Sequence, residues 1–282
     1  MAGNITKLKR QLRSIQSTKK LTNAMSLVAT AKLQKERTRL EANEKHSIVY
    51  EEFLYKVLSA RHEGEETNGF LKPSKVDNPL HIVLTSNSGL CGSYNLDLLR
   101  YVEKTISKND AIFAIGTYGI KWLKTHDYMV VKEISDLDDF RPSSINKIIN
   151  NIMTLYANDE ISSIDIIYTD YINTLTYTPR TFPLLPIIYD KEEIDEKDIL
   201  LEPSRDEVLN KLIPMYVSSE IYTKFLESKT SENAARRAAM DGANKNADNL
   251  ISDLRIKYNQ ARQSAITQEM NEITAGSLRQ EG

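Results

Sequence analysis

The distribution of proline and glycine divides this 282-residue chain into two uninterrupted ends and a punctuated middle. All eight prolines lie between Pro73 and Pro214, and residues 4–63 contain neither proline nor glycine. Beyond Pro214 the only residues of these two types are Gly242, Gly276 and Gly282. Because proline and glycine most often interrupt helices, each end can form one long helix. A helix of 60 residues extends about 90 Å, farther than a compact domain of this size.

Apolar periodicity supports helices at both ends. The first arm carries a stripe with 3-4-3 spacing at Ile5, Leu8, Leu12 and Ile15, which Leu21, Met25 and Val28 are expected to resume. Leu33 and Leu40 follow one heptad apart, and residues 48–58 form a broad apolar face. A helix that begins with a sparse seam and ends on a domain is therefore predicted.

The second arm opens at Ser204 and Glu207, which have the spacing of a capping box. Pro214 should kink this helix or mark a restart, because an interior proline costs about 3 kcal/mol. An alanine-rich stretch follows, and the seam is expected to continue at Leu250, Leu254, Ala261 and Ala265.

The middle of the chain alternates strand and helix signals. Strands are predicted over 81–85, 111–115, 128–134, 164–171 and 175–182, the last two as a possible hairpin. Helices are predicted over 96–106, 120–124 and 143–156. Strands separated by helices favour βαβ units and a mainly parallel sheet.

Composition excludes several classes. Apolar residues make up 40% and charged residues 27%, and no apolar run approaches the ~20 residues of a membrane span. Cys91 is the single cysteine, so no internal disulfide forms, which fits a reducing compartment. The first residues lack the hydrophobic core of a secretion signal. The net charge of −2 conceals an asymmetry, because residues 1–35 hold eight Lys/Arg and no acid.

No catalytic constellation is evident, and the chain has no phosphate-binding P-loop. Gly89 and Gly92 follow a predicted strand, where they could form either a phosphate site or a structural turn. Cys91 fits a small buried side chain better than a nucleophile, and the four histidines lack metal-ligand spacing. We therefore expect no catalytic residue, no metal site and no bound cofactor.

The basic first arm has three interpretations. It could neutralise nucleic-acid phosphates, it could be an organelle transit peptide, or it could face acidic protein surfaces. A coiled-coil nucleic-acid-binding protein and an α/β enzyme with helical extensions both remain alternatives at this point.

Four motifs that occur in order along the chain are more specific than any of the features above. Residues 14–33 read SIQSTKKLTNAMSLVATAKL, residues 85–92 read TSNSGLCG with Asn95 after them, residues 231–236 read SENAAR with Ala239 and Met240 after them, and residues 257–269 contain KYNQARQ followed by ITQE, with Glu272 beyond. Together they resemble the F-type ATP synthase gamma-subunit family over nearly the whole chain. Asn87 and Ser88 depart from this family's usual Asp-Arg pair, so a salt bridge at that place is not expected.

The resemblance implies an α/β fold with long terminal helices, in which the N- and C-terminal helices form an antiparallel coiled coil beside a Rossmann-like central α/β domain. The expected boundaries are 1–65 for the N-terminal helix, 66–190 for the α/β domain, 191–203 for an acidic connection and 204–282 for the C-terminal helix.

It further implies a central-stalk rotor, one copy per complex. This rotor couples ion flow through the membrane sector to ATP synthesis or hydrolysis at the beta subunits, and it regulates ATPase activity and ion flow. The implied partners are the alpha3beta3 hexamer of alpha and beta subunits, the epsilon subunit and the membrane c-ring, with no nucleic acid. The subunit would be non-catalytic within an ion-transporting ATPase, and peripheral on the cytoplasmic face of a bacterial cell membrane.

Six residues match family positions at contacts with partners. Met25 corresponds to a position facing a beta-subunit lever. Arg262, Gln263, Thr267 and Glu269 correspond to polar positions near the catch between gamma and beta, and Glu202 to a lower-stalk position near the c-ring. Seam packing for Met25 and exposed helix surface for the others remain open interpretations.

Overall fold

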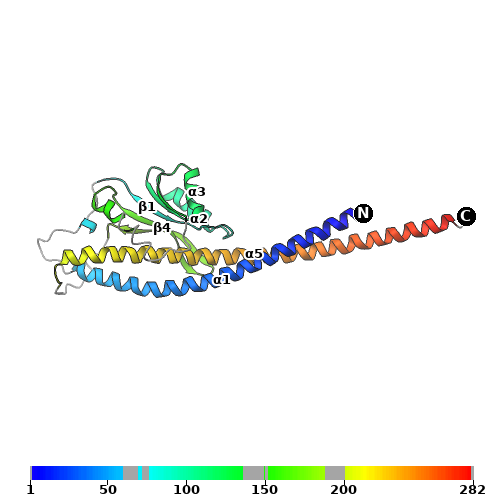
Figure 1. The fold of residues 1–282 in the computed structure, drawn as a ribbon, viewed down its shortest axis with the longest axis horizontal. Helices are drawn as coiled ribbons and strands as arrows, with labels where there is room; N and C mark the ends of the chain where they lie inside the picture. The colour runs from blue at the N-terminus through cyan, green and yellow to red at the C-terminus, as the bar shows by residue number, and fades with distance from the viewer. Residues whose placement is uncertain are drawn as a thin grey trace. The chain divides into compact units, whose positions relative to one another are not determined.

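The computed structural model describes residues 2–59, 69–71, 76–135, 149, 152–187 and 201–280, with the backbone alone for 2–4, 272 and 274–280. The elements, in chain order (Figure 1), are α1 (Ala2–Ser59), η1 (Gly69–Leu71), β1 (Leu80–Leu84), α2 (Tyr94–Thr105), β2 (Ala111–Ile115), α3 (Thr117–Thr125), β3 (Val130–Ile134), β4 (Ile164–Asn173), β5 (Thr176–Leu185) and α5 (Arg205–Gln280). Residues 152–157 are also helical. The strands and helices expected from the sequence are therefore confirmed wherever the chain is described.

The chain divides into two compact units, and both terminal helices contribute to each. We call residues 1–29 with 236–282 the terminal unit and residues 30–235 the central unit. In each unit α1 and α5 run side by side and antiparallel, which confirms the expected pairing (Figure 1). Four interhelical contacts define this direction: Thr22–Asn244 and Ser26–Asp241 in the terminal unit, and Asn43–Thr223 and Ser47–Glu220 in the central unit.

The start of α5 follows the predicted capping chemistry. The Glu207 amide donates a hydrogen bond to Ser204 Oγ at 3.3 Å, which satisfies one of the free amides of the first turn. The helix then runs through Pro214 to Gln280 as a single element of 76 residues, so the expectation of a restart at Pro214 is wrong. The first turns of α5 lie against a large apolar cluster, and tertiary packing offsets the local cost of the proline.

A five-stranded sheet forms the middle of the central unit, in the order β3-β2-β1-β4-β5. The pairs β2–β3, β1–β2 and β1–β4 are parallel, and β5 returns antiparallel to β4 as a hairpin. The predicted mainly parallel sheet and the predicted hairpin are both confirmed. The hairpin outreaches β1, because β1 pairs with residues 164–167 of β4 whereas β5 pairs with β4 as far as Asn173.

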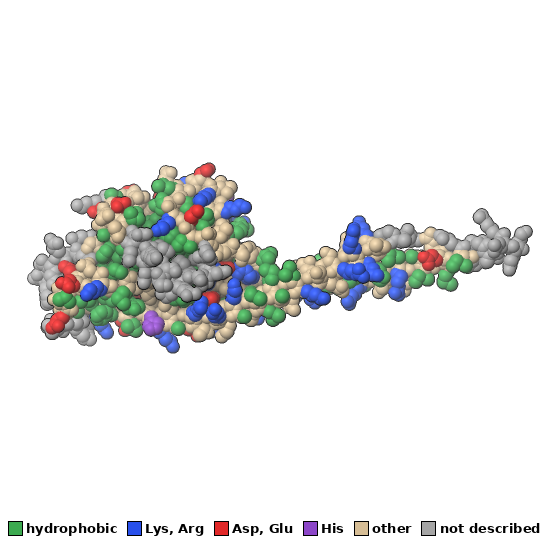
Figure 2. Space-filling view, viewed as in Figure 1, with side chains coloured by type: hydrophobic (Ala, Val, Ile, Leu, Met, Phe, Trp, Pro, Cys, Tyr) green, Lys and Arg blue, Asp and Glu red, His purple; other side chains and the backbone are tan. Residues whose placement is uncertain are grey.

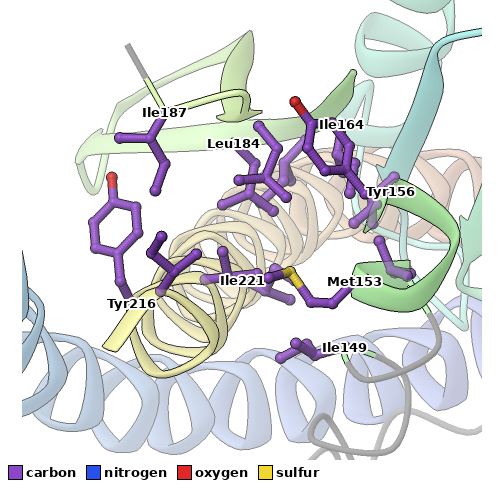
Figure 3. Packing of buried hydrophobic residues seen from close by; sticks show 14 of the residues in the cluster. Ile149, Met153, Tyr156, Ile164, Leu184, Ile187, Tyr216 and Ile221 are labelled. Carbon is purple, nitrogen blue, oxygen red and sulfur yellow. The ribbon is translucent and has the colours of Figure 1, made fainter. Parts of the chain in front are cut away.

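Both faces of the sheet are covered, as expected of a parallel sheet. Val83 and Ile112 face α2 and α3, where Leu98, Val102 and Leu123 complete a small core. Ile82 and its neighbours on the other face join a larger core with α1, α5 and the helical residues 152–157. Figure 3 shows part of this core, with Ile149, Met153, Tyr156, Ile164, Leu184, Ile187, Tyr216 and Ile221 converging from four segments. The central unit is therefore a three-layer α/β/α structure.

Arg205, at the start of α5, binds the end of α1 within the central unit. Its Nε donates to the Val57 carbonyl at 2.9 Å and its Nη2 to the Leu58 carbonyl at 3.2 Å. These carbonyls belong to the last turn of α1. Carbonyls in the last turn have no hydrogen-bond partner within the helix, and the negative end of the helix dipole favours a cation there. A buried arginine at the first residue of α5 therefore caps the end of α1. The domain boundaries proposed from the sequence stay a prediction, and residues 191–200 of the acidic connection lie outside the described residues.

Gly116 permits a close approach between β1 and the start of α3. Its φ is +102°, and an added Cβ would overlap the Thr85 carbonyl oxygen. We expect Gly116→Ala to destabilise the chain by more than about 2 kcal/mol in urea unfolding, because both backbone strain and a steric clash oppose it.

Gly242 is the matched control for this substitution. It lies exposed within α5, where an added Cβ meets nothing within 4 Å. Gly242→Ala should stabilise its helix by about 1 kcal/mol through helix propensity alone. Equal stability of Gly116→Ala and the parent chain would contradict this account of the β1–α3 contact.

Candidate coupling surface

Small and polar side chains form the contact between α1 and α5 in the terminal unit. Thr22 Oγ1 donates to Asn244 Oδ1 at 2.5 Å, and Ser26 Oγ donates to Asp241 Oδ1 at 2.6 Å. The buried seam positions nearby include Ala29, Met240, Ala247 and Ile251. Hydrogen bonds across the seam satisfy the partly buried polar groups, and small side chains allow the helices to approach closely. Specific polar contacts therefore hold this pair of helices together beside the buried side chains of Met240 and Ile251.

The structure corrects three seam positions expected from the sequence. Leu21, Val28 and Leu250 are 62%, 57% and 50% exposed, so the expectation that they resume the seam is wrong. The buried line instead passes through Ser26 and Ile251, one residue away in the helical pattern. The hydroxyl of Ser26 finds a carboxylate partner across the seam, which removes the penalty that would otherwise exclude a buried polar residue.

The burial of the first apolar stripe of α1 agrees with the prediction, and the burial of the later part of α1 agrees with it only in part. Ile5, Leu8, Leu12 and Ile15 are all half-buried, as predicted. In the central unit Leu33, Leu40, Leu54, Val57 and Leu58 are buried, whereas Ile48, Val49 and Phe53 of the predicted apolar face are exposed.

The surface of the terminal unit combines exposed apolar side chains with positive charge. Leu27, Ile256 and Met270 are 66%, 55% and 64% exposed, in addition to Leu21 and Val28. The unit contains 13 Lys/Arg and 6 Asp/Glu, a formal charge of +7. Figure 2 shows green apolar and blue basic side chains beside one another on the visible face of the paired terminal helices. Such a surface suits contact with acidic partners that also offer apolar area.

Five of the six predicted contact residues belong to the terminal unit. Met25 is half-buried on α1, beside the seam residue Ser26. Arg262, Gln263, Thr267 and Glu269 are exposed on α5, and the Thr267 hydroxyl donates to the Gln263 carbonyl at 3.0 Å.

Arg262 and Glu269 are seven residues apart, and Gln263 and Thr267 four, so they form two adjacent rows. Glu202 is exposed just before α5 in the central unit. The roles of these six residues stay predictions.

The turn after β1 is tied together by its own side chains. The Ser86 amide donates to Asn95 Oδ1 at 3.1 Å, Asn95 Nδ2 donates to Ser86 Oγ at 2.7 Å, and the Thr117 amide donates to Asn87 Oδ1 at 3.2 Å. Leu90 and Gly92 have φ of 62° and 61°. Cys91 is buried against Tyr94 and Ala235, as expected of a structural cysteine. The arrangement favours the structural-turn interpretation of this segment.

Within the part of the chain that the structure describes, no group of three or more His, Cys, Asp and Glu side chains is placed to hold a metal ion. His81 lies between Asp110 and Asp165, with Nε2 and Nδ1 at 3.4 and 3.5 Å from their carboxylates. None of the described helices is long and apolar enough to cross a bilayer.

Comparison with known proteins decides the family. The protein-family model described as ATP synthase matches residues 4–278. The ATP synthase gamma chain of Mycoplasma mycoides subsp. mycoides SC is 35% identical over 278 residues, which are 97% of this chain and 98% of that protein. The ATP synthase gamma chain of Ureaplasma urealyticum serovar 10 is 37% identical over 286 residues, 96% of this chain and 98% of that protein.

The chain belongs to the ATP synthase gamma-chain family. This membership confirms the resemblance drawn from the four motifs and assigns the chain to an ATP-synthesising complex. It favours the rotor interpretation over a nucleic-acid-binding coiled coil and over an α/β enzyme.

Solved structures support the fold. A chain of the Euglena gracilis mitochondrial ATP synthase, in the OSCP/F1/c-ring part in rotational state 3, matches with a TM-score of 0.72 at 16% identity, covering 98% of this chain and 94% of that one. A chain of the Tetrahymena thermophila mitochondrial ATP synthase central stalk/c-ring matches with a TM-score of 0.62 at 23% identity, covering 79% and 99%. The expected fold of paired terminal helices with a central α/β domain is confirmed.

Sequence reasoning missed the polar seam and the role of Arg205. The stripe was expected at Leu21, Met25 and Val28, although Thr22, Ser26 and Ala29 themselves have the spacing of a helix seam. Arg205 gave no local signal, because its carbonyl partners are 148 and 147 residues away in the chain.

A double-mutant cycle tests the seam. We expect Ser26→Ala and Asp241→Ala to show a coupling energy of about 1 kcal/mol, because they remove the two ends of one partly buried hydrogen bond. Hydrogen exchange of the amides around both residues measures the stability of the pairing.

The exposed pair Lys19–Asp248 is the control, with side chains 37% and 58% exposed. Its coupling should be below about 0.5 kcal/mol and should fall with added salt. Equal coupling in the two pairs would contradict the assignment of the seam.

Proposed function

We propose that this chain is the rotating central shaft of an F-type ATP synthase, coupling ion flow through the membrane sector to ATP synthesis or hydrolysis at the beta subunits. The chain itself is non-catalytic and binds no cofactor. The observation that carries the proposal is the surface of the terminal unit, where a net charge of +7 accompanies strongly exposed leucine, isoleucine and methionine side chains.

A two-helix unit with such a surface is best stabilised inside partners. Exposed apolar side chains such as Leu27 and Met270, at 66% and 64%, gain free energy when a neighbour removes them from water. The positive charge favours acidic surfaces and disfavours misplaced basic ones. A ring of three alpha and three beta subunits around the terminal unit would supply both, with one copy of this chain per ring.

Coupling then follows from the asymmetry of the helix pair. Two helices have no rotational symmetry that matches a threefold ring, so each beta subunit meets a different side of the terminal unit. Contacts that differ with the angle of rotation bias each beta subunit toward a different conformation. Catalysis remains with the beta subunits, while this chain supplies the bias and thereby also regulates ATPase activity and ion flow.

The central unit would join the epsilon subunit and the membrane c-ring. The described residues include no helix that could span a bilayer, which fits peripheral attachment through partners. Chains of the same fold occur in the central stalk/c-ring and OSCP/F1/c-ring parts of solved mitochondrial ATP synthases. This supports a position between the alpha and beta subunits and the membrane sector. Since the curated relatives include Mycoplasma and Ureaplasma proteins, we place the complex on the cytoplasmic face of a bacterial cell membrane.

Within this proposal the predicted contact residues take distinct roles. Met25 lies toward a beta-subunit lever, and the exposed rows Arg262–Glu269 and Gln263–Thr267 meet the catch of the beta subunits. Glu202 meets the lower partners near the c-ring. The exposure of the α5 residues and of Glu202 leaves them free for such contacts.

Co-expression with alpha and beta subunits tests the proposal. The chain should co-purify with both in a ratio of one to three to three, and a bead attached to the central unit should turn during ATP hydrolysis. A chain that leaves alpha and beta unbound, while binding DNA or RNA with steep salt dependence, would instead support the nucleic-acid interpretation.

Met25→Lys tests the coupling contact. We expect the complex to assemble and hydrolyse ATP while ion pumping per ATP falls at least about twofold, because a long cation adds an ionic contact to the beta lever and impedes rotation. Pumping by inverted vesicles, divided by the rate of ATP hydrolysis, measures the effect.

Met25→Leu is the control and should couple like the parent, since it conserves volume without charge. A Met25→Lys complex that pumps as many ions per ATP as the parent would rule out the assigned contact.

A further inference from the structure

Three charged side chains lie on one face of α5 in the central unit, away from water. Glu220, Lys224 and Glu227 are four and three residues apart, so they share a face of the helix. Glu220 and Glu227 are each 7% exposed, and the Lys224 side chain is 14% exposed. Charged groups are seldom buried to this degree unless each finds a partner.

The Glu220 end of the cluster faces α1. Its carboxylate accepts a hydrogen bond from the Ser47 hydroxyl of α1. The charge of Glu51 in α1 raises the pKa of Glu220, and the charge of Lys224 in α5 lowers it. Both Glu220 and Glu51 also act electrostatically on the Tyr216 hydroxyl.

The Glu227 end faces the β4–β5 hairpin. Lys224 Nζ lies 3.0 Å from Glu227 Oε1 and stands over the Tyr168 and Phe182 rings at 5.1 and 4.8 Å. Glu227 Oε2 is buried, and the Tyr168 hydroxyl of β4 acts on the Glu227 carboxylate as well. Asp170 of β4 adds a further negative charge nearby, which its ion pair with Arg180 of β5 at 3.1 Å partly compensates.

The charges in this cluster do not balance. One ammonium faces two buried carboxylates, and both Glu51 and Asp170 add negative potential. Leaving a net negative charge away from water is costly, and the protein lowers this cost by binding a proton. Burial accordingly raises the pKa of Glu220 and the pKa of Glu227 above 4.5, although Lys224 acts in the opposite direction on both.

We propose that Glu220, Lys224 and Glu227 form a proton-binding site in which the folded chain holds one proton shared between the two carboxylates. The proton comes from water and forms an O–H bond on one carboxylate, leaving the other paired with Lys224. Lys224 acts electrostatically on both carboxylates, so a proton on either one leaves the other to balance the single ammonium. This property concerns the central unit alone and does not depend on the proposed rotor function.

The site makes the packing of α5 depend on pH. Above pH 4.5, the ordinary pKa of glutamate, an unfolded chain releases the proton while the folded chain retains it. The stability that the proton provides is therefore complete below that pH and is lost as the pH rises through the folded pKa of the pair. At alkaline pH the cluster carries a buried negative charge between α5, α1 and the hairpin.

Glutamine substitutions test the site in the full chain. We expect Glu220→Gln and Glu227→Gln each to leave one carboxylate for one ammonium, so that no proton is needed. The unfolding constant of the parent relative to either variant should stay constant below about pH 4.5 and then rise by up to tenfold per pH unit until the proton is lost. Urea unfolding between about pH 4 and about pH 8 measures this ratio.

Two further variants make the test specific. Glu52→Gln changes an exposed glutamate of α1 and should run parallel to the parent at every pH. Lys224→Met removes the single cation and should steepen the pH dependence beyond the parent, because both carboxylates then require protons. A parent chain whose unfolding constant runs parallel to those of both glutamine variants would overturn the proposal.

Infrared spectroscopy provides a readout that does not depend on unfolding. The folded parent should show the carbonyl band of a protonated carboxyl at a pH where exposed glutamates are ionised, and Glu220→Gln should lack it. Glu52→Gln should retain the band. Absence of this band from the folded parent between about pH 5 and about pH 6, where exposed glutamates are ionised, would also overturn the proposal.

Discussion

The antiparallel pairing of α1 and α5 is the interaction on which the rest of the structure depends. In the central unit the paired helices close one face of the sheet, so their apolar side chains join a core of three layers. The terminal unit consists of the same two helices, and within its described residues only a narrow seam is buried. One pair of helices therefore has a broad apolar core in one unit and a polar seam in the other.

The polar seam explains why large apolar side chains lie outside it. A helix pair buries one stripe of each helix, and Thr22, Ser26 and Ala29 occupy that stripe on α1. Leu21 and Val28, which neighbour these positions, consequently point to the surface. Specific hydrogen bonds fix the register of the pair, while the apolar area that would otherwise stabilise it remains available to partners. The residues that fix the register and the exposed apolar residues are thus different residues of the same turns.

The sequence predicted the elements well because proline, glycine and periodicity act locally. It placed β2 at residues 111–115, as observed, and it anticipated the cap at Ser204. It failed where the decisive partner is distant: the Ser26 hydroxyl is stabilised by Asp241, and Arg205 binds carbonyls of α1. A pattern search that expects apolar seams cannot anticipate a polar residue whose cost is offset across the fold. For the same reason the sequence pattern did not indicate that Glu220, Lys224 and Glu227 are buried. The four family motifs, in contrast, indicated the family directly.

The division into two units also resolves the near-zero net charge of the chain. The terminal unit carries +7, and the central unit, with 24 Lys/Arg and 33 Asp/Glu, carries −9. Charges of opposite sign select different neighbours, and misplacing either unit against the other's partner would be repulsive. Part of the excess of carboxylates in the central unit is buried, since Glu220 and Glu227 lie in its interior with a single Lys224. Carboxylates at the surface of this unit are screened by salt, whereas the buried carboxylates of Glu220 and Glu227 are screened much less, and burial raises the pKa of both.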